Sequence, residues 1–261
     1  MKISFSCTMC GRCCHGLRLP LSVDEASQWL ARGGSVELFC EAIPWLDEPA
    51  PDNGPAAHKR RRSFPAVSGQ LPIRVIVSLM ASFPDACPNL LPDMRCGIYD
   101  ERPRACRVYP AEVNPHVPFD PATKLCPPDA WASVATLRDD TGAWTDPEVA
   151  RSITAMRDAD ARDARVKSRL CASLGIDVAG LSNEATVVHR PLSERLADAL
   201  RRAQRDDTDT GGHRDWRLAS HRRHTMQLLA QASCHAVDAT ALPDALAFLG
   251  FVPGDEAATG A

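Results

Sequence analysis

The chain has 261 residues, of which 44% are hydrophobic and 24% are charged, and its formal net charge is −3. A chain of this length can bury a hydrophobic core without help from disulfides or metals. The small negative charge gives no reason to expect binding of nucleic acid. Of the 30 basic residues 26 are Arg, so an Arg beside a candidate site is weak support by itself.

The eleven cysteines favour metal ligation over disulfides. The first residues, MKISFSCTMCGRCC, contain no apolar segment typical of a signal peptide, and no later stretch approaches 18 consecutive apolar residues. We therefore expect a cytoplasmic protein without a membrane segment. Cytosolic thiols are kept reduced, so cysteines in that compartment are more often metal ligands than disulfide partners.

The N-terminal elements follow from short local patterns. Alternating Ile3, Phe5 and Cys7 predict a short strand. The spacing of Ser22 and Glu25 is that of a capping box, so a helix is expected near 23–32.

The next stretches carry weaker signals. The proline-containing segment 47–70, with its basic run HKRRR, predicts an exposed loop. The apolar run 73–81 is too short to separate a buried strand from a helix. Residues 84–128 contain ten prolines and little periodicity, so they predict irregular loops.

The second half of the chain shows helical spacing. A helix is expected from Pro147, capped by Asp146, to a stop at Gly175. Further helices are expected over 191–206, over 214–233 and, as a short one, after Pro243. The polar stretch 206–212 divides the first two.

These patterns predict a mostly α fold with irregular loops. They divide the chain into a cysteine-cluster metal-binding domain over 1–135, with little strand, and a helical region over 136–261. The helical region is the expected contact surface for another protein, and no nucleic acid or membrane partner is expected.

Eight cysteines fall in two groups, with the intervals C-x2-C-x2-C-C and C-x8-C-x9-C-x19-C. They are Cys7, Cys10, Cys13, Cys14, Cys87, Cys96, Cys106 and Cys126. Two-residue spacers let successive thiolates surround one centre, and C-x2-C-x2-C is typical of ferredoxin-type [4Fe–4S] ligation. Adjacent side chains of an extended chain point to opposite sides. One member of the Cys13–Cys14 pair is therefore spare, or the pair bridges two centres.

Other interpretations of the cysteines are weaker. Core thiols and a C-x2-C redox pair are the alternatives for residues 7–14, but no βαβ unit follows them. Cys40, Cys171 and Cys234 stand alone and are expected to be core thiols. His15 could replace a thiolate, although a solvated side chain is the more common role.

Five arginines lie close in sequence to a predicted ligand and could offset the charge of bound thiolates. They are Arg12, Arg95, Arg104 and Arg107, each within two residues of a cysteine, and Arg102, four residues before Cys106.

The two compound motifs, CTMCGRCC and CGIYDERPRACRVYP, together with Cys87 and Cys126, resemble the YkgJ-like cysteine-cluster family, which is described as chelating zinc or iron. The resemblance covers roughly residues 3–130 and implies that the eight cysteines are metal ligands. The wider family includes flagellin lysine N-methylases, but the chain lacks the glycine-rich run of a Rossmann methyltransferase.

The sequence therefore predicts a cytoplasmic metal-binding protein. An iron–sulfur cluster is the first choice of cofactor and zinc is the alternative. Whether the chain is an enzyme stays open, with S-adenosylmethionine-dependent protein lysine methylation as the candidate activity. A structural zinc module for protein–protein contact is the third hypothesis.

Overall fold

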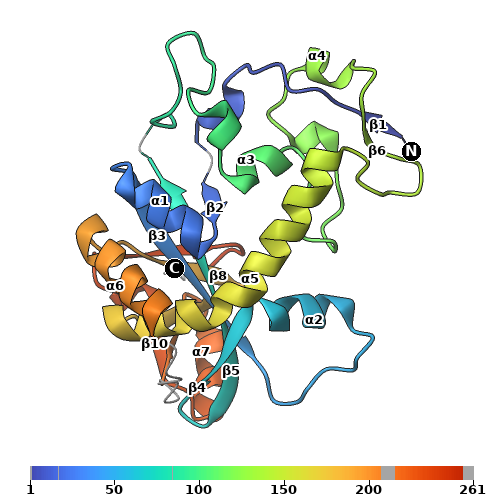
Figure 1. Ribbon diagram of the computed structural model, residues 1–261. Helices are drawn as coiled ribbons and strands as arrows, with labels where there is room; N and C mark the ends of the chain where they lie inside the picture. The colour runs from blue at the N-terminus through green and yellow to red at the C-terminus, as the bar shows by residue number, and fades with distance from the viewer. Residues whose placement is uncertain (1, 17, 84, 207–214, 255–261) are drawn as a thin grey trace, which may run out of the picture.

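The computed structural model describes residues 2–16, 18–83, 85–206 and 215–254 (Figure 1). Its centre is a mixed sheet of nine strands. These are β2 Leu19–Leu21, β3 Ser35–Pro44, β4 Ser63–Ser68, β5 Leu71–Ser82, β7 Val178–Leu181, β8 Ala185–His189, β9 Arg217–Ser220, β10 Ala236–Asp238 and β11 Leu246–Gly250. A separate two-stranded sheet pairs β1, Ile3–Ser4, with β6, Thr136–Arg138.

Two long antiparallel strands, β3 and β5, form the middle of the sheet and pair from Ser35 opposite Ser82 to Pro44 opposite Ile73. The outer edge of β5 carries β2 and β4. The other edge of β3 carries β8 near its start and β7 further along, and β9 and β10 continue the sheet from β7. The last strand, β11, pairs with β8.

Seven α-helices and four 3-10 turns are present in the described ranges. They are α1 Val23–Ala31, α2 Gly54–Arg61, α3 Arg104–Val108, α4 Pro128–Trp131, α5 Pro147–Leu174, α6 Ser193–Arg205 and α7 Arg223–Gln231, with η1 Arg12–Cys14, η2 Tyr99–Glu101, η3 Pro121–Thr123 and η4 Ala239–Ala241. Among the described residues, none of these helices combines the length and apolarity needed to cross a membrane.

The main hydrophobic core lies between the sheet and the helices α1, α5 and α6 (Figure 1). Leu38, Leu79, Leu170 and Leu196 are completely buried there. Burying a side chain of this size contributes about 1.5–3 kcal/mol. The sheet region therefore has a core of its own.

A second, smaller core supports the cysteine-rich loops. Its buried members are Val108, Ala111, Leu137, Val149 and Ile153. The last two belong to the N-terminal half of α5, whereas the C-terminal half of this helix packs in the main core. At 1.5 Å per residue α5 is about 42 Å long, so one helix spans both regions (Figure 1).

The prediction of a mostly α fold is wrong. The described residues are about 36% helical and 26% strand, and the large mixed sheet dominates the fold. The N-terminal part supplies β2 to β5, and the C-terminal part, expected to be helical, supplies β7 to β11. Strands β7 and β8 are buried on both faces, so they lack the alternation that marks a strand. In β5 buried positions do alternate with partly exposed ones, apart from the run Val75 to Val77.

Two helices agree with the sequence patterns. At the start of α1, Ser22 and Glu25 form the predicted capping box. In α5, the Asp146 carboxylate accepts hydrogen bonds from the backbone N–H groups of Glu148 and Val149, and Gly175 ends the helix with a φ of 74°. The described residues of the predicted irregular segment, 85–128, are largely irregular, with only short helical turns.

Three local predictions need correction. The expected loop 47–70 contains α2 and β4. The expected helix 214–233 is strand β9 followed by α7, and the segment after Pro243 forms β11 in place of a helix. Residues 207–212 of the predicted polar divider lie outside the described residues. The boundary between 135 and 136 stays a prediction.

Candidate metal centre

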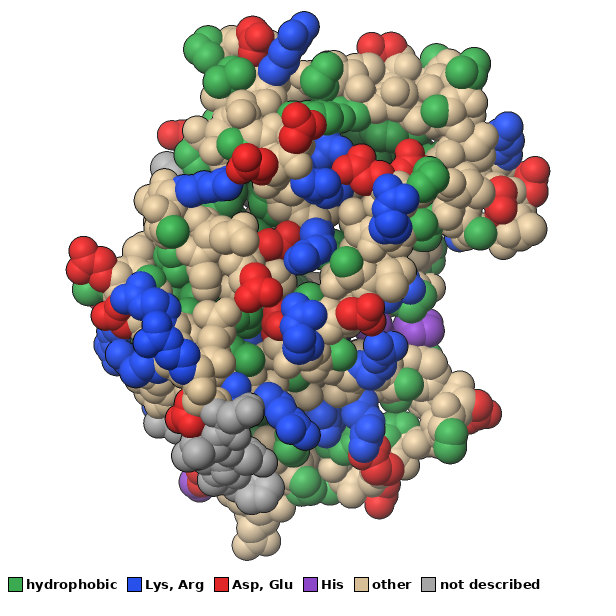
Figure 2. All heavy atoms as spheres, viewed as in Figure 1, with side chains coloured by type: hydrophobic (Ala, Val, Ile, Leu, Met, Phe, Trp, Pro, Cys, Tyr) green, Lys and Arg blue, Asp and Glu red, His purple; other side chains and the backbone are tan. Residues whose placement is uncertain are grey.

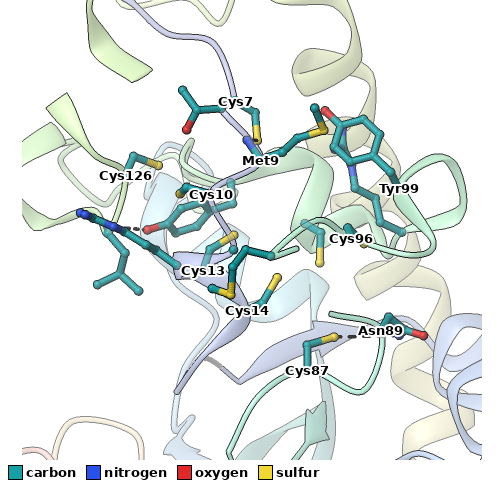
Figure 3. Close-up of a pocket in the computed structure, with 18 of the residues that line it drawn as sticks. Cys7, Met9, Cys10, Cys13, Cys14, Cys87, Asn89, Cys96, Tyr99 and Cys126 are labelled. Atoms are coloured by element: carbon teal, nitrogen blue, oxygen red, sulfur yellow. Dashed lines mark hydrogen bonds between the residues drawn. The ribbon is translucent and has the colours of Figure 1, made fainter. Parts of the chain in front are cut away.

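The eight predicted cysteine ligands line one cavity above the sheet (Figure 3). They come from the loop before and within η1, from the loop 87–96, from α3 and from the segment before α4. The cavity has a volume of about 90 Å³, enough for several water molecules or a small inorganic group. Residues up to 119 positions apart in sequence are therefore brought to one place, and seven of the eight thiols are partly buried.

The first cysteine loop depends on Gly11. This residue has a φ of 71°, and a Cβ there would lie 2.8 Å from the backbone oxygen of Met94. Glycine is the residue that tolerates both a left-handed conformation and such a close approach. Gly11 thus lets the loop carrying Cys10 and Cys13 pack against the loop carrying Cys96.

A backbone hydrogen bond joins the first loop to the second. The N–H of Cys87 donates to the carbonyl oxygen of Cys14 at 2.7 Å. An isolated antiparallel bridge between His15 and Ala86 continues this pairing. The two cysteines are thereby held side by side although 72 residues separate them in sequence.

Cys13 and Cys14 do not diverge as an extended chain would require. They lie in the tight turn η1, and their thiols share a hydrogen bond. That bond lowers the pKa of Cys13 to about 7, and it raises the pKa of Cys14, which burial raises further. The hydrogen bond between Cys13 and Cys14 therefore connects the thiols on one side of the cavity with those on the other.

Burial favours the protonated form of three further thiols, Cys87, Cys106 and Cys126. It raises the pKa of Cys106 and of Cys126 to about 12, with nearby thiols adding to the effect, and it raises the pKa of Cys87. Such thiols lose their proton when a cation replaces it. The cavity thus provides thiol donors of the kind that zinc and iron prefer.

Neighbouring thiols influence one another's pKa across the whole cavity. Cys126 is affected by Cys7, Cys10 and Cys13. Cys13 also affects Cys14, Cys87 and Cys106, and Cys14 and Cys106 are each affected by Cys87 and Cys96. Figure 3 shows Cys7, Cys10 and Cys126 on one side of Cys13, and Cys14, Cys87 and Cys96 on the other, so Cys13 lies between two groups of thiols.

The thiols share a cavity but do not yet converge on one point. As placed, no group of three or more His, Cys, Asp or Glu side chains in the described part of the chain could hold a metal ion. The donor set fits zinc or iron by its chemistry, and rotation of a Cys side chain between staggered rotamers is a small change. The side chains would have to turn inward on metal binding.

Three side chains beside the thiols, which were not singled out from the sequence, hold the cysteine-rich loops in place. The Tyr109 hydroxyl accepts a hydrogen bond from the backbone N–H of Leu125 at 2.7 Å, and Trp131 Nε1 donates to the carbonyl oxygen of Cys126 at 3.4 Å. Tyr109 belongs to the CRVYP part of the second motif, so the motif itself held the signal for this residue. Asn89 lies with its amide 3.9 Å from Cys87 Sγ.

Of the five predicted arginines, Arg12 and Arg102 line the cavity. Arg102 stacks on the Tyr99 ring, 3.8 Å from its centroid, and its Nε is buried without a hydrogen-bond partner among the described residues. Its terminal nitrogen lies 3.4 Å from a carboxylate oxygen of Glu148. The other three also pair with carboxylates. Arg95 lies beside Asp93, Arg104 beside Glu25 and Arg107 beside Glu148.

The remaining candidates lie outside the cavity. Cys40 and Cys171 are buried in the main core, and their thiols are hydrogen-bonded to each other. Cys234 is partly exposed. The ring of His15 lies with Nδ1 3.2 Å from the carbonyl oxygen of Gly11, and His15 does not line the cysteine cavity.

Comparison with known protein families gives a match over the cysteine-rich part of the chain. Residues 6–127 match the family CxxCxxCC, described as "Putative zinc- or iron-chelating domain". No curated protein and no solved structure matches the chain. The matched segment contains all eight cysteines that line the cavity.

Proposed function

Because residues 6–127 match the CxxCxxCC family, we propose that the cysteine cavity holds two neighbouring thiolate-bound metal centres. The first is an iron–sulfur cluster of the [4Fe–4S] type, and the second is a further iron or zinc centre. The observation that carries the proposal is the gathering of all eight thiols around one cavity, with Cys7, Cys10 and Cys126 on one side of Cys13 and Cys14, Cys87 and Cys96 on the other (Figure 3).

The first set combines the C-x2-C-x2-C run with one remote cysteine. Its members are Cys7, Cys10, Cys13 and Cys126. Three closely spaced thiolates and a distant fourth are a common ligand pattern for a four-iron cluster. This composition favours iron–sulfur ligation over zinc, which more often uses separated C-x2-C pairs.

The second set joins the first through the Cys13–Cys14 hydrogen bond. Its members are Cys14, Cys87, Cys96 and Cys106. The chain holds these thiols with the Cys87–Cys14 backbone hydrogen bond and with α3, whose Arg104 is anchored to Glu25 of α1. A four-thiol site of this kind suits a structural metal that organises irregular loops.

A bound cluster would supply one-electron transfer or a structural centre at this position. The residues of the chain contribute positive charge and exclusion of water. After the Cys14 hydrogen bond, the Arg102 guanidinium also lowers the pKa of Cys13. It partly offsets the burial that raises the pKa of Cys106, so its charge favours the thiolate forms of both residues. Apolar neighbours such as Leu19 and Phe83 close the cavity toward the sheet.

The test uses anaerobically purified protein with iron, zinc and acid-labile sulfide measured on one sample. We expect iron with sulfide and a broad visible absorption band from thiolate-to-iron charge transfer. Cys10→Ser should remove the sulfide and the iron bound with it. Cys96→Ser should leave the sulfide and lower the remaining metal. Cys234→Ser is the matched control, because this thiol lies outside the cavity.

The other outcomes separate the alternatives. Full metal in both Cys10→Ser and Cys96→Ser would refute the ligand assignment, and complete loss in each would indicate a single shared centre. Colourless protein with zinc alone would favour the structural zinc module. Methyl transfer stays a second hypothesis, tested by titration with S-adenosylmethionine; the described residues offer no feature that favours it.

A further inference from the structure

A second group of side chains, unrelated to the cysteines, surrounds a separate basic cavity. This cavity of about 200 Å³ lies between the end of α2, the middle of α5 and the loop at His116. Its charged lining consists of His58, Arg61, Arg62, His116, Arg157 and Asp160. Three guanidinium groups, two imidazoles and one carboxylate therefore line this cavity.

The helix C-terminus explains only part of this charge. The run HKRRR ends α2, where the negative end of the helix dipole favours cations. That effect does not account for Arg157 and His116, which reach the same cavity from α5 and from a loop. In Figure 2, Lys and Arg side chains gather over α2 and the adjoining part of α5.

The cationic groups are only weakly neutralised by the protein. Arg61 lies 3.8 Å from Asp158, and both side chains are about 62% exposed, so this pair contributes little. In the described ranges, neither Arg62 nor Arg157 forms a direct ion pair. Arg157 Nε donates to the carbonyl oxygen of Val113 at 2.8 Å, which orients its guanidinium group.

The single carboxylate of the cavity is already engaged. Asp160 lies 3.5 Å from the ammonium group of Lys167, whose side chain is only 4% exposed. His58 Nε2 is buried and has no hydrogen-bond partner within the described residues. Burial, together with Arg62 and His116, lowers the pKa of His58, so the ring is a neutral donor or acceptor near pH 7.

A larger cavity of about 420 Å³ adjoins the basic one and shares His58, Arg62 and Asp160 with it. It runs over Leu19 and Leu21 of the sheet to Cys13 and Cys106. This volume is in the range of sites for small organic molecules. An anionic group in the basic cavity could therefore belong to a molecule whose body lies in the adjoining one.

We propose that the basic cavity binds the phosphate group of a small phosphate monoester, with the rest of the molecule in the adjoining cavity. Arginine forks match the geometry of phosphate oxygens, and several forks converging from different elements give such a site its specificity. The concave shape favours a small molecule over a polyanion. The basic cavity itself is lined by no cysteine, whereas the adjoining cavity reaches Cys13 and Cys106 of the proposed metal centres.

The experiment is calorimetric titration of the purified, metal-loaded full chain with inorganic phosphate and with phenyl phosphate. We expect both to bind, and phenyl phosphate to bind at least about ten-fold more tightly because its ring buries apolar surface. Arg157→Gln should weaken binding of phenyl phosphate by about ten-fold or more, since it removes a charge-assisted hydrogen bond.

Arg60→Gln is the matched control. Arg60 lies in the same basic run but pairs with Glu48 at 2.8 Å and does not line the cavity, so affinity should stay within about two-fold of the parent chain. If Arg157→Gln does not fold, as judged by circular dichroism, Arg62→Gln takes its place with the same expected loss.

Three results would overturn the proposal. The first is no binding of either compound at millimolar concentration. The second is an equal loss of affinity in Arg60→Gln and in the cavity variant, which would indicate a general charge effect. The third is binding of an RNA oligonucleotide or a phosphopeptide without binding of the small phosphates, which would indicate a macromolecular ligand.

Discussion

The sheet region and the cysteine-rich loops of this chain are stabilised by different means. The main core buries Leu38 and Leu79 of the sheet and Leu170 of α5 completely, together with a large set of apolar neighbours from α1, α5, α6 and α7. The loops above it share a much smaller apolar core around Val108 and Ile153, and most of their cysteines are partly exposed. The difference teaches that the sheet can specify its own structure, whereas the loops depend on ligands for the thiols.

Removal of metal should therefore give the largest change in stability, and this change should be confined to the cysteine-rich loops. After chelation we expect faster proteolysis within residues 85–128, while the circular dichroism of the sheet region changes little. Structural metal–thiolate sites contribute about 10 kcal/mol or more, so the local cleavage rate should rise by two orders of magnitude or more. Unchanged cleavage after complete metal loss would contradict the proposed dependence.

Leu170→Ala tests the other side of the comparison. Leu170 of α5 is completely buried in the main core, and its truncation should lower the free energy of unfolding by about 2–5 kcal/mol. Urea denaturation would measure this change, and the metal content of the folded protein should stay the same. Leu228→Ala, at a side chain that is 50% exposed, is the control and should change stability by about 0.5 kcal/mol or less.

Ser22→Ala should have the smallest effect. The substitution removes the capping box of α1 and should lower the free energy of unfolding by about 1 kcal/mol. The control is Ser27→Ala, inside the same helix, where Ala is at least as favourable as Ser. If both variants lose the same stability in urea denaturation, the cap is not the cause.

The sequence predicts best where one local interaction determines the structure. Asp146 and Gly175 mark the two ends of α5 because each satisfies backbone groups that a helix terminus leaves free. The sheet could not be found in this way. Its strand β3 is paired with β5 on one edge and with strands more than 130 residues away on the other, and only tertiary contact creates that environment.

The sequence predicted which cysteines form the candidate site better than it predicted how their side chains are arranged. The spacing of the motifs indicated which cysteines belong together, and all eight line one cavity. The hydrogen bond between the Cys13 and Cys14 thiols depends on the turn η1, which the assumption of an extended chain missed. The roles of Tyr109 and Trp131 depend on contacts between loops that a spacing pattern does not contain.

The two halves of α5 face different cores, and this has a consequence for how the chain can vary. One inserted residue would rotate everything beyond it by about 100°, because an α-helix has 3.6 residues per turn. Either Val149 and Ile153 or Leu170 and Leu174 would then turn toward solvent. Insertions and deletions are therefore far better tolerated in the surface segment 45–53 than within this helix, which can change in composition but not in length.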